Sequence, residues 1–210
     1  VPDATRTVDQ RKSGIPSPTG VFAMSRFVFV PPTSAGLFSR IALIGPPNAG
    51  KTWTALTLAN ALGPNTGLID SEHRSAAKYR RIFKFVHVTM DTFDPADLTE
   101  AIADAAEQRI NPLIIDSWSH YWEGADGMLE QVDKATARAG RTDKFGSGWK
   151  EMRPVERRML EAILAYPGHV IVTLRTKTEH VIERNERTGK QEPKRILANG
   201  APNHLSQLWY

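Results

Sequence analysis

The sequence predicts an α/β fold in which a mostly parallel β-sheet is flanked by helices and followed by a C-terminal β-hairpin. Three observations carry this prediction. Short apolar runs alternate with segments of helical periodicity along the 210 residues. The segment Gly45–Thr52, GPPNAGKT, lies between one such run and one such segment and fits the pattern G-x-x-x-x-G-K-[ST]. Two strand-like runs flank the turn sequence at residues 185–189, as they do in a β-hairpin.

The pattern at Gly45–Thr52 is that of a P-loop, which binds the phosphates of a nucleotide. Successive backbone N–H groups of such a loop form a nest around phosphate oxygens. Lys51 can reach the β- and γ-phosphates, and the Thr52 hydroxyl can hold a Mg²⁺ ion that bridges them. A helix that starts at Lys51 also aims its N-terminus at the phosphates. A Gly- and Pro-rich turn can match this pattern by chance, but the flanking strand and helix favour a nucleotide site.

The composition is typical of one globular domain with short tails. Hydrophobic residues make up 40% and charged residues 24%, and no apolar run approaches the roughly 18 residues of a membrane span. The absence of cysteine excludes disulfides and thiol catalysis, and it suits the cytoplasm. A net charge of +4 permits a nucleic-acid partner without demonstrating one. We expect a flexible tail over residues 1–24, a core over 25–197 and a second tail over 198–210.

Periodicity and turn residues place the individual elements. The expected strands cover residues 26–30, 40–44, 66–70, 83–88, 112–116 and 168–174, and the run at 40–44 is typical of a buried parallel strand. The expected helices cover 51–62, 94–109, part of 124–139, and 149–165, with Pro154 near the first turns of the last one and a short helix or turn at 75–81. Hairpin arms are expected near 179–184 and 190–197. The helix residues expected to face the core are Leu56, Leu58, Ala59, Leu62, Leu98, Ile102, Ala105, Met128, Leu129, Val132, Met159, Leu160, Ile163 and Leu164.

Two acidic residues follow predicted strands and complete the candidate site. Asp116 ends the strand at 112–116, where a carboxylate can meet the P-loop magnesium directly or through water. Glu72 lies just past the strand at 66–70, where a carboxylate can polarise the water that attacks the γ-phosphate. A solvated loop acid is the alternative interpretation of Glu72.

Several segments together resemble those of the RecA-type recombinases. Leu68–His73, LIDSEH, is similar to their strand-and-glutamate segment, and Leu113–Ser117, LIIDS, is similar to their Walker B strand. The closer resemblance is to the small phage ATPases with a minimal RecA core, which act as single-strand annealing proteins. It covers about Arg26 to Lys194, and it rests on the order and spacing of Gly45–Leu58, Leu68–Ala76, Leu113–Leu129 and His169–Glu183. The resemblance implies a RecA-like P-loop NTPase fold and an ATPase activity.

The resemblance also implies a role for each residue of the candidate ATP site. Glu72 corresponds to the catalytic glutamate, Lys51 and Asp116 share in catalysis, and Thr52 and Asp116 hold Mg²⁺. RecA favours glutamine where this chain has Arg175, so γ-phosphate sensing by Arg175 or Lys177 stays open, and either residue could instead act on the nucleotide of a neighbouring subunit. The implied nucleotide-binding residues are Gly45, Pro46, Pro47, Asn48, Ala49, Gly50, Lys51, Thr52, Trp53 and Arg175.

The DNA-binding loops of the family follow the strands that correspond to 112–116 and 168–174. Their counterparts here are His120–Met128 and Thr176–Lys190. Aromatic rings in the first loop are expected to stack on bases, and basic residues in the second are expected to bind phosphates. The alternatives are that the rings pack inside the protein and that the basic residues form a solvated hairpin face. The residues expected to bind DNA are Tyr121, Trp122, Lys177, Arg184, Arg187 and Lys190.

The expected function is Mg²⁺-dependent ATP binding and hydrolysis by a protein that acts on single-stranded DNA in phage-type homologous recombination or strand annealing. Single-stranded DNA and further copies of the chain are the expected partners, a single-strand-binding protein is a further candidate, and no membrane is expected. A phage-encoded protein of this kind would act in the cytoplasm of its bacterial host. Two alternatives stay open, namely a DNA-annealing module in which the nucleotide is a structural switch and a helicase-loader-type P-loop ATPase.

Overall fold

The computed structural model describes residues 30–31, 36–139, 146–184 and 191–198. The chain divides into two units, Val1–Ala35 and Gly36–Tyr210, and only Val30 and Pro31 of the first unit are described. The predicted strand at 26–30 therefore lies almost entirely outside the described residues, and so do both predicted tails apart from Ala198. That strand and the predicted domain boundaries stay predictions.

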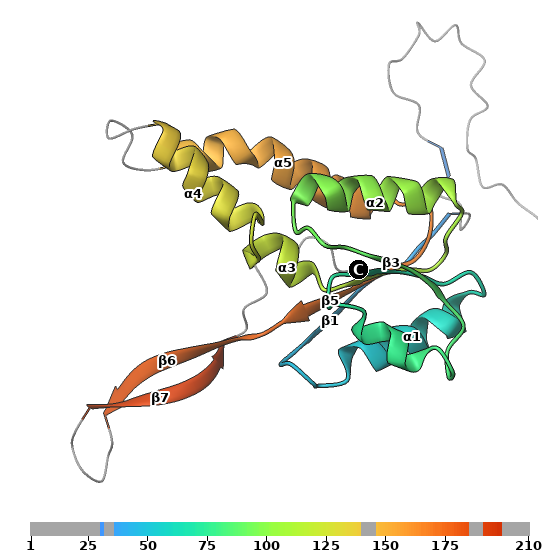
Figure 1. Ribbon diagram of the computed structural model, residues 1–210, viewed down its shortest axis with the longest axis horizontal. Coiled ribbons are helices and arrows are strands. Elements are labelled where there is room, and N and C mark those ends of the chain that lie inside the picture. Colours follow the sequence, from blue (N-terminus) through green and yellow to red (C-terminus); the bar gives the residue numbers. More distant parts are fainter. Residues whose placement is uncertain (1–29, 32–35, 140–145, 185–190, 199–210) are drawn as a thin grey trace, which may run out of the picture. The chain divides into compact units, whose positions relative to one another are not determined.

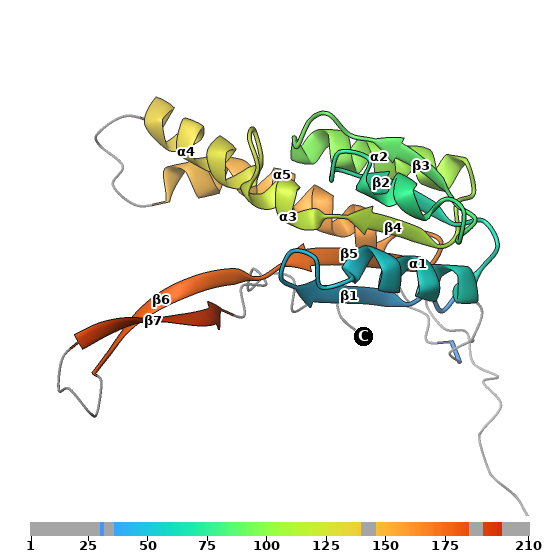
Figure 2. The same ribbon diagram turned by 60° about the horizontal axis from the view of Figure 1, so that its bottom comes forward.

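The second unit is built on a five-stranded sheet with the strand order β1-β5-β4-β2-β3 (Figures 1 and 2). Every pair of neighbouring strands runs parallel, so the carboxyl ends of the strands meet at one edge. In the register Asp70 lies opposite Asp116, and Gly45 lies opposite Arg175. Ligands gather at this edge in open parallel sheets. The strands are β1 (Arg40–Gly45), β2 (Gly67–Asp70), β3 (Val86–Thr89), β4 (Leu113–Asp116) and β5 (Val170–Arg175).

Helices cover both faces of the sheet (Figure 1). α1 (Lys51–Leu62) and the short 3₁₀ helix η1 (Ser75–Tyr79) pack on one face. α2 (Pro95–Glu107) and α5 (Ser147–Leu164) pack on the other face. α3 (Trp118–Glu123) follows β4 directly, and α4 (Met128–Ala139) packs along α5. The predicted α/β fold, with a parallel sheet flanked by helices, is confirmed.

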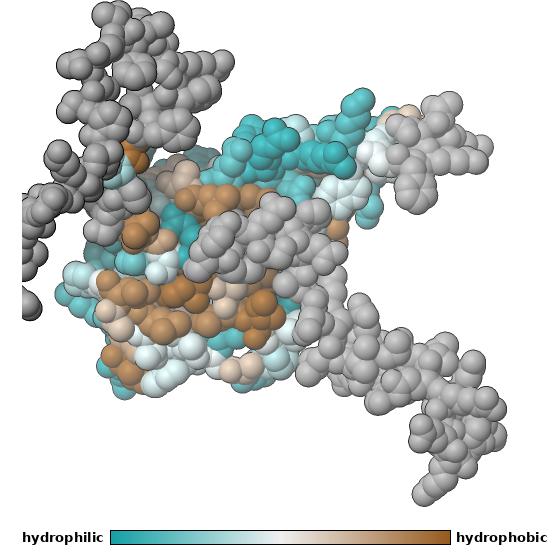
Figure 3. Space-filling model, turned by 180° about the vertical axis from the view of Figure 1, so that it is seen from behind, coloured by the Kyte–Doolittle hydropathy of each residue, from teal (hydrophilic) through white to brown (hydrophobic). Residues whose placement is uncertain are grey.

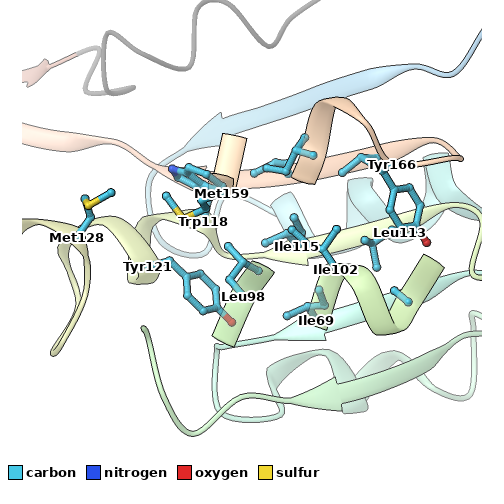
Figure 4. Packing of buried hydrophobic residues seen from close by; sticks show 14 of the residues in the cluster. Ile69, Leu98, Ile102, Leu113, Ile115, Trp118, Tyr121, Met128, Met159 and Tyr166 are labelled. Carbon is cyan, nitrogen blue, oxygen red and sulfur yellow. The ribbon is translucent and has the colours of Figure 1, made fainter. Parts of the chain in front are cut away.

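Each face of the sheet has its own hydrophobic cluster. The larger cluster buries Leu98 and Ile102 of α2 against Ile69 and Ile115 of the sheet (Figure 4). The smaller cluster buries Leu56 of α1 against the opposite face of the same strands. Burial of each such side chain contributes about 1.5–3 kcal/mol to stability. The sheet edge that carries the candidate site is thus held between two packed layers.

α2 begins at the capping pair that the sequence predicts. Asp94 Oδ1 accepts a hydrogen bond of 2.7 Å from the Ala96 N–H, and Pro95 occupies the first helical position. The residues of this helix that were expected to face the core are all buried. The start and the inward face of α2 are therefore confirmed.

Three predictions of burial are wrong, and the positions of the residues explain why. β1 is an edge strand of the described sheet, so most of the run at 40–44 is only half-buried and its Ile44 is exposed. Figure 3 views the molecule from the side on which β1 lies and shows a band of hydrophobic residues there. Leu62 and Leu164 are exposed because each is the last residue of its helix, where the chain leaves the sheet.

Several element boundaries also differ from prediction by a few residues. α5 begins at Ser147 instead of residue 149, so Pro154 lies further from the start of the helix than predicted, and it lacks the N–H that would bond back along the chain. β3 begins at Val86 instead of residue 83 because the Phe83 N–H donates to the Tyr79 carbonyl (3.0 Å), which keeps residue 83 in the turn that follows η1.

The predicted C-terminal hairpin is confirmed. β6 (Lys177–Arg184) and β7 (Gln191–Ala198) pair in antiparallel fashion as a separate two-stranded sheet. None of the helices in the described part of the chain is long and apolar enough to cross a membrane.

Candidate nucleotide site

A polar pocket of about 280 Å³ opens where the strands of the sheet end. The P-loop between β1 and α1 and the segment from β2 to η1 form its walls, and residues at the ends of β4 and β5 complete it. The predicted site residues that line the pocket are Pro47, Asn48, Gly50, Lys51, Thr52, Glu72, Asp116 and Arg175. Ser75, Lys78 and Tyr79 of η1 also line it and were not predicted.

The P-loop has a backbone that needs both of its glycines. Gly50 has a φ of +81°, in the left-handed region that side chains disfavour. A Cβ added at Gly45 would lie 3.3 Å from the Cβ of Ala49, closer than ordinary van der Waals contact. The loop therefore turns tightly at both glycines, as the P-loop pattern predicts.

Lys51 lies across the P-loop. Its Nζ donates hydrogen bonds to the carbonyl oxygens of Gly45 (3.0 Å) and Pro46 (2.9 Å). Burial lowers the pKa of Lys51, while the charges of Asp116 and Glu72 raise it, and the net shift is downward. The ammonium can exchange these carbonyl partners for the more strongly binding oxygens of a nucleotide phosphate.

Asp116 and Thr52 meet, as a shared metal site requires. Asp116 is only 2% exposed, and its carboxylate accepts hydrogen bonds from the hydroxyls of Thr52 (2.6 Å) and Thr173 (2.5 Å). Burial raises the pKa of Asp116, although these two hydrogen bonds lower it in part. A carboxylate and a hydroxyl at this spacing are oxygen donors of the kind that Mg²⁺ prefers, so the residues present fit the ion.

Glu72 is held by Arg175 across the pocket. The guanidinium donates from Nε to Oε1 at 3.1 Å and from Nη2 to Oε2 at 2.5 Å, in a two-pronged ion pair. Burial raises the pKa of Glu72, but the hydrogen bonds and the charge of Arg175 outweigh burial and hold this pKa below its ordinary value. Both residues therefore belong to one site, in which Arg175 contacts the predicted base directly.

Two buried polar residues at the end of β2 fix the backbone at Glu72, and sequence reasoning did not select them. Asp70 accepts hydrogen bonds from the N–H groups of Glu72 (2.8 Å) and Ala76 (3.4 Å). The backbone N–H of Ser117 donates a hydrogen bond of 2.9 Å to Ser71 Oγ. The peptide bond between Asp116 and Ser117 is cis. The signal that could have found them is a pair of polar residues directly after an apolar strand.

His120 of α3 is a further residue of this site that sequence reasoning did not assign to it. Its Nδ1 lies 2.9 Å from Ser71 Oγ, and its Nε2 lies 3.8 Å from Glu72 Oε1. Its ring packs against Phe93 at a centroid distance of 4.9 Å. Burial lowers the pKa of His120, and the charge of Glu72 raises it in part. His120 thus links α3 to the carboxylate that was predicted to be catalytic.

Trp53 does not line the pocket, although it was predicted to bind the nucleotide. Its ring packs edge-to-face on Tyr79 (5.6 Å between centroids) and on Phe83 (4.9 Å). The Tyr79 ring does line the pocket, with Lys78 Nζ 5.0 Å from its centroid. Tyr79 therefore lies beside the P-loop, and its ring contacts that of Trp53, which is itself exposed.

The structure gives different results for the individual residues predicted to bind DNA. Tyr121 is 0% exposed and lies in the larger hydrophobic cluster, so the prediction that it stacks on a base is wrong. Trp122 is half-buried with its ring 6.0 Å from that of Trp149, which supports the packing alternative. Lys177 and Arg184 are the end residues of β6. Arg187 and Lys190 lie outside the described residues.

The parallel sheet, the P-loop and the acidic residues beside it define a P-loop NTPase. A family model described as "AAA domain" matches residues 38–205, and the chain belongs to that family. Among solved structures, the chain is similar to one titled "Crystal structure of the RadB recombinase", with 18% sequence identity, a TM-score of 0.42 and coverage of 74% of this chain and 68% of that one. The comparison with curated proteins gives no match.

Proposed function

We propose that the protein binds and hydrolyses ATP and that hydrolysis serves the handling of single-stranded DNA in phage-type recombination or strand annealing. One observation carries the ATPase part. The P-loop lysine, the Thr52–Asp116 pair and Glu72 all border one pocket. Phosphate binding, metal binding and a base are the three requirements of phosphoryl transfer to water. The pocket therefore supports hydrolysis as well as binding.

Each group has a separate task in this proposal. The P-loop N–H groups and Lys51 bind the phosphate chain, and Tyr79, which lines the pocket, contacts the nucleotide base. Thr52 and Asp116 would hold Mg²⁺. When bound, the ion neutralises charge that develops on the phosphate oxygens.

Glu72 acts as the base for the attacking water. It accepts a proton from the water whose oxygen bonds to the γ-phosphorus, while the bond from that phosphorus to the bridging oxygen breaks and ADP leaves. Because Arg175 occupies both oxygens of Glu72, the base is available only when the guanidinium withdraws. A γ-phosphate is the natural competing partner, since it offers the guanidinium oxygens of higher charge.

The DNA part of the proposal rests on where the chain leaves the site. β4 leads directly into α3, and β5 leads directly into the hairpin strand β6, so both segments continue from the strands that carry Asp116 and Arg175. Lys177, Arg184, Arg187 and Lys190 supply positive charge in the second segment. We assign DNA contact to these residues and not to Tyr121. Assembly of several copies, with a single-strand-binding protein as a further partner, completes the proposal.

A nucleotide-dependent structural switch with little turnover is the second candidate. The observation that favours it is the Glu72–Arg175 pair, because a base held by an arginine and with a lowered pKa is a poor proton acceptor.

Rates of ATP hydrolysis with and without single-stranded DNA distinguish these functions. The proposed enzyme hydrolyses ATP in the presence of Mg²⁺, and single-stranded DNA raises the rate. The switch binds ATP but hydrolyses it slowly under both conditions. A rate of ATP hydrolysis that single-stranded DNA does not change would favour the helicase-loader type of ATPase. Failure of the folded protein to bind ATP would overturn the whole proposal.

A further inference from the structure

The two sides of the sheet carry opposite charge. The face formed by α1 and η1 contains no Asp or Glu within residues 51–62 or 73–90. Residues 91–133, which include α2, β4, α3 and the start of α4, contain eleven acidic residues, among them the buried Asp116 of the nucleotide site, and the single basic residue Arg109. On the same face as α2, α5 carries mixed charge, with Lys150, Arg153, Arg157 and Arg158 beside Glu151, Glu156 and Glu161. α1 lies below the sheet and α2 above it in Figure 1. The side of α1 and η1 is therefore the side that attracts anions.

Positive charge on this face is concentrated and exposed. Among the described residues, the observed ion pairs involve none of its lysines and arginines. A solvated charged surface usually intersperses both signs, so a run of one sign favours a polyanionic partner. The exposed basic residues are Arg74, Lys78, Arg80, Arg81 and Lys84. We call this set the η1 basic surface.

One exposed ring and one exposed aliphatic side chain lie beside these charges. Trp53 is 43% exposed where it projects from α1, and it packs on Tyr79 and Phe83, which flank Arg80 and Arg81 in the chain. Ile82, between Arg81 and Phe83, is 62% exposed. Proteins that bind single-stranded nucleic acid combine basic residues along the backbone path with rings on which unpaired bases stack.

We infer that the η1 basic surface binds a strand of single-stranded nucleic acid, with phosphates on Arg80, Arg81 and Lys84 and a base against Trp53. These three basic residues do not line the nucleotide pocket, whereas Lys78 and Tyr79 do. The surface also comes from a different part of the chain than the segments after β4 and β5, so it gives the strand a second point of attachment. The inference rests on the proposed function, because it takes single-stranded nucleic acid as the partner.

Anisotropy of a fluorescent single-stranded oligonucleotide, measured over a salt series with the full chain, tests the inference. The variant Arg80→Gln/Arg81→Gln/Lys84→Gln removes three charges from the surface. Its matched control is Arg153→Gln/Arg157→Gln/Arg158→Gln, which removes three exposed charges from α5. Melting curves of both variants check folding. Should the triple variant melt early, the single variants Arg81→Gln and Lys84→Gln replace it.

A plot of log affinity against log salt has a negative slope, and each single-strand phosphate contact contributes about 0.7 to its magnitude. The surface variant is therefore expected to have a slope smaller in magnitude by about 2. At about 0.1 M salt, this corresponds to binding weaker by on the order of 10²-fold. The α5 control is expected to keep the slope of the parent. An unchanged slope in the surface variant, or an equal loss in both variants, overturns the inference but leaves the proposed function intact. Absence of binding by the parent overturns both. Tighter binding of duplex than of single strand overturns the role of Trp53.

Discussion

At the scale of single residues, the contact that most constrains the chemistry is the ion pair between Glu72 and Arg175. Arg175 holds the pKa of Glu72 below its ordinary value against the opposing effect of burial. A base loses activity as the pH falls through its pKa. The pair therefore keeps Glu72 ionised at a lower pH than burial alone would allow, and at the same time it covers both of its oxygens.

Replacing Arg175 should move the acid limb of the ATPase pH profile. Arg175→Gln removes the positive charge that lowers the pKa of Glu72, whereas burial still raises this pKa. The pKa of Glu72 therefore rises, and activity is lost at a higher pH than in the parent. The value of kcat/KM reports on the free enzyme, in which the ion pair forms, so kcat/KM measured from about pH 4 to about pH 8 shows this as a shifted limb. The exposed control Arg153→Gln should keep the parent profile. An identical profile in Arg175→Gln would place the ion pair outside the reaction.

Replacing the Asp116 carboxylate with a neutral amide should reduce ATP hydrolysis without reducing the stability of the fold. Because burial raises its pKa, its charged form costs folding free energy at neutral pH, and this cost disappears as the pH falls through the folded pKa. Asp116→Asn should therefore melt at or above the temperature of the parent near neutral pH, with the difference narrowing at lower pH. Its turnover should fall and need more Mg²⁺. A variant that melts well below the parent at neutral pH would show that the carboxylate stabilises the fold.

At the scale of elements, the sequence predicts those segments whose signals are local. α2 carries its own start signal in Asp94 and Pro95, and its periodicity identifies the buried face. Burial at Ile44, Leu62 and Leu164 is mispredicted because it depends on strand order and on where a helix ends. The network around Asp70 and Ser71 is missed for a related reason. Its members come from β2, β4 and α3, and no sequence spacing joins them.

α3 offers a test of whether its aromatic residues pack or bind DNA. Tyr121→Ala empties a fully buried site and should cost about 3–5 kcal/mol of stability, as large-to-small changes at buried aromatic residues do. Tyr121→Phe should be neutral or stabilising, because the Tyr121 hydroxyl is buried without a hydrogen-bond partner among the described residues. Denaturant unfolding measures both variants. Weaker DNA binding by Tyr121→Phe at unchanged stability would contradict the packing role.

At the scale of the whole molecule, the fold brings distant stretches of the chain to one edge. Sequence motifs alone predict Lys51, Thr52, Glu72 and Asp116 as site residues. The first two belong to the P-loop pattern, and the two acidic residues lie at or just past the ends of predicted strands. They do not reveal that Arg175 forms an ion pair with Glu72 or that Tyr79 lines the pocket, since both contacts depend on the packing of β5 and η1. The charge difference between the two faces is likewise visible only once α1 and α2 are placed on opposite sides of the sheet.

Nucleotide binding should stabilise the whole domain, and this gain should depend on the P-loop. A ligand present at about 100 times its Kd adds about 2.7 kcal/mol to the free energy of unfolding. ATP with Mg²⁺ should therefore raise the melting temperature of the parent. Lys51→Ala should keep the fold but lose most of this rise, because it removes a positive charge that lines the pocket and would bind the phosphates. An undiminished rise in Lys51→Ala would mean that ATP binds elsewhere.

The central claim is that this pocket hydrolyses ATP with Glu72 as the base, and turnover of Glu72→Gln beside its ATP affinity tests it most directly. Glutamine keeps the shape of glutamate but cannot accept the proton from water. The variant should bind ATP about as the parent does and hydrolyse it on the order of 10²-fold more slowly or worse. Glu100→Gln, an exposed change on α2, should hydrolyse ATP like the parent. Turnover close to that of the parent in folded Glu72→Gln would contradict the account.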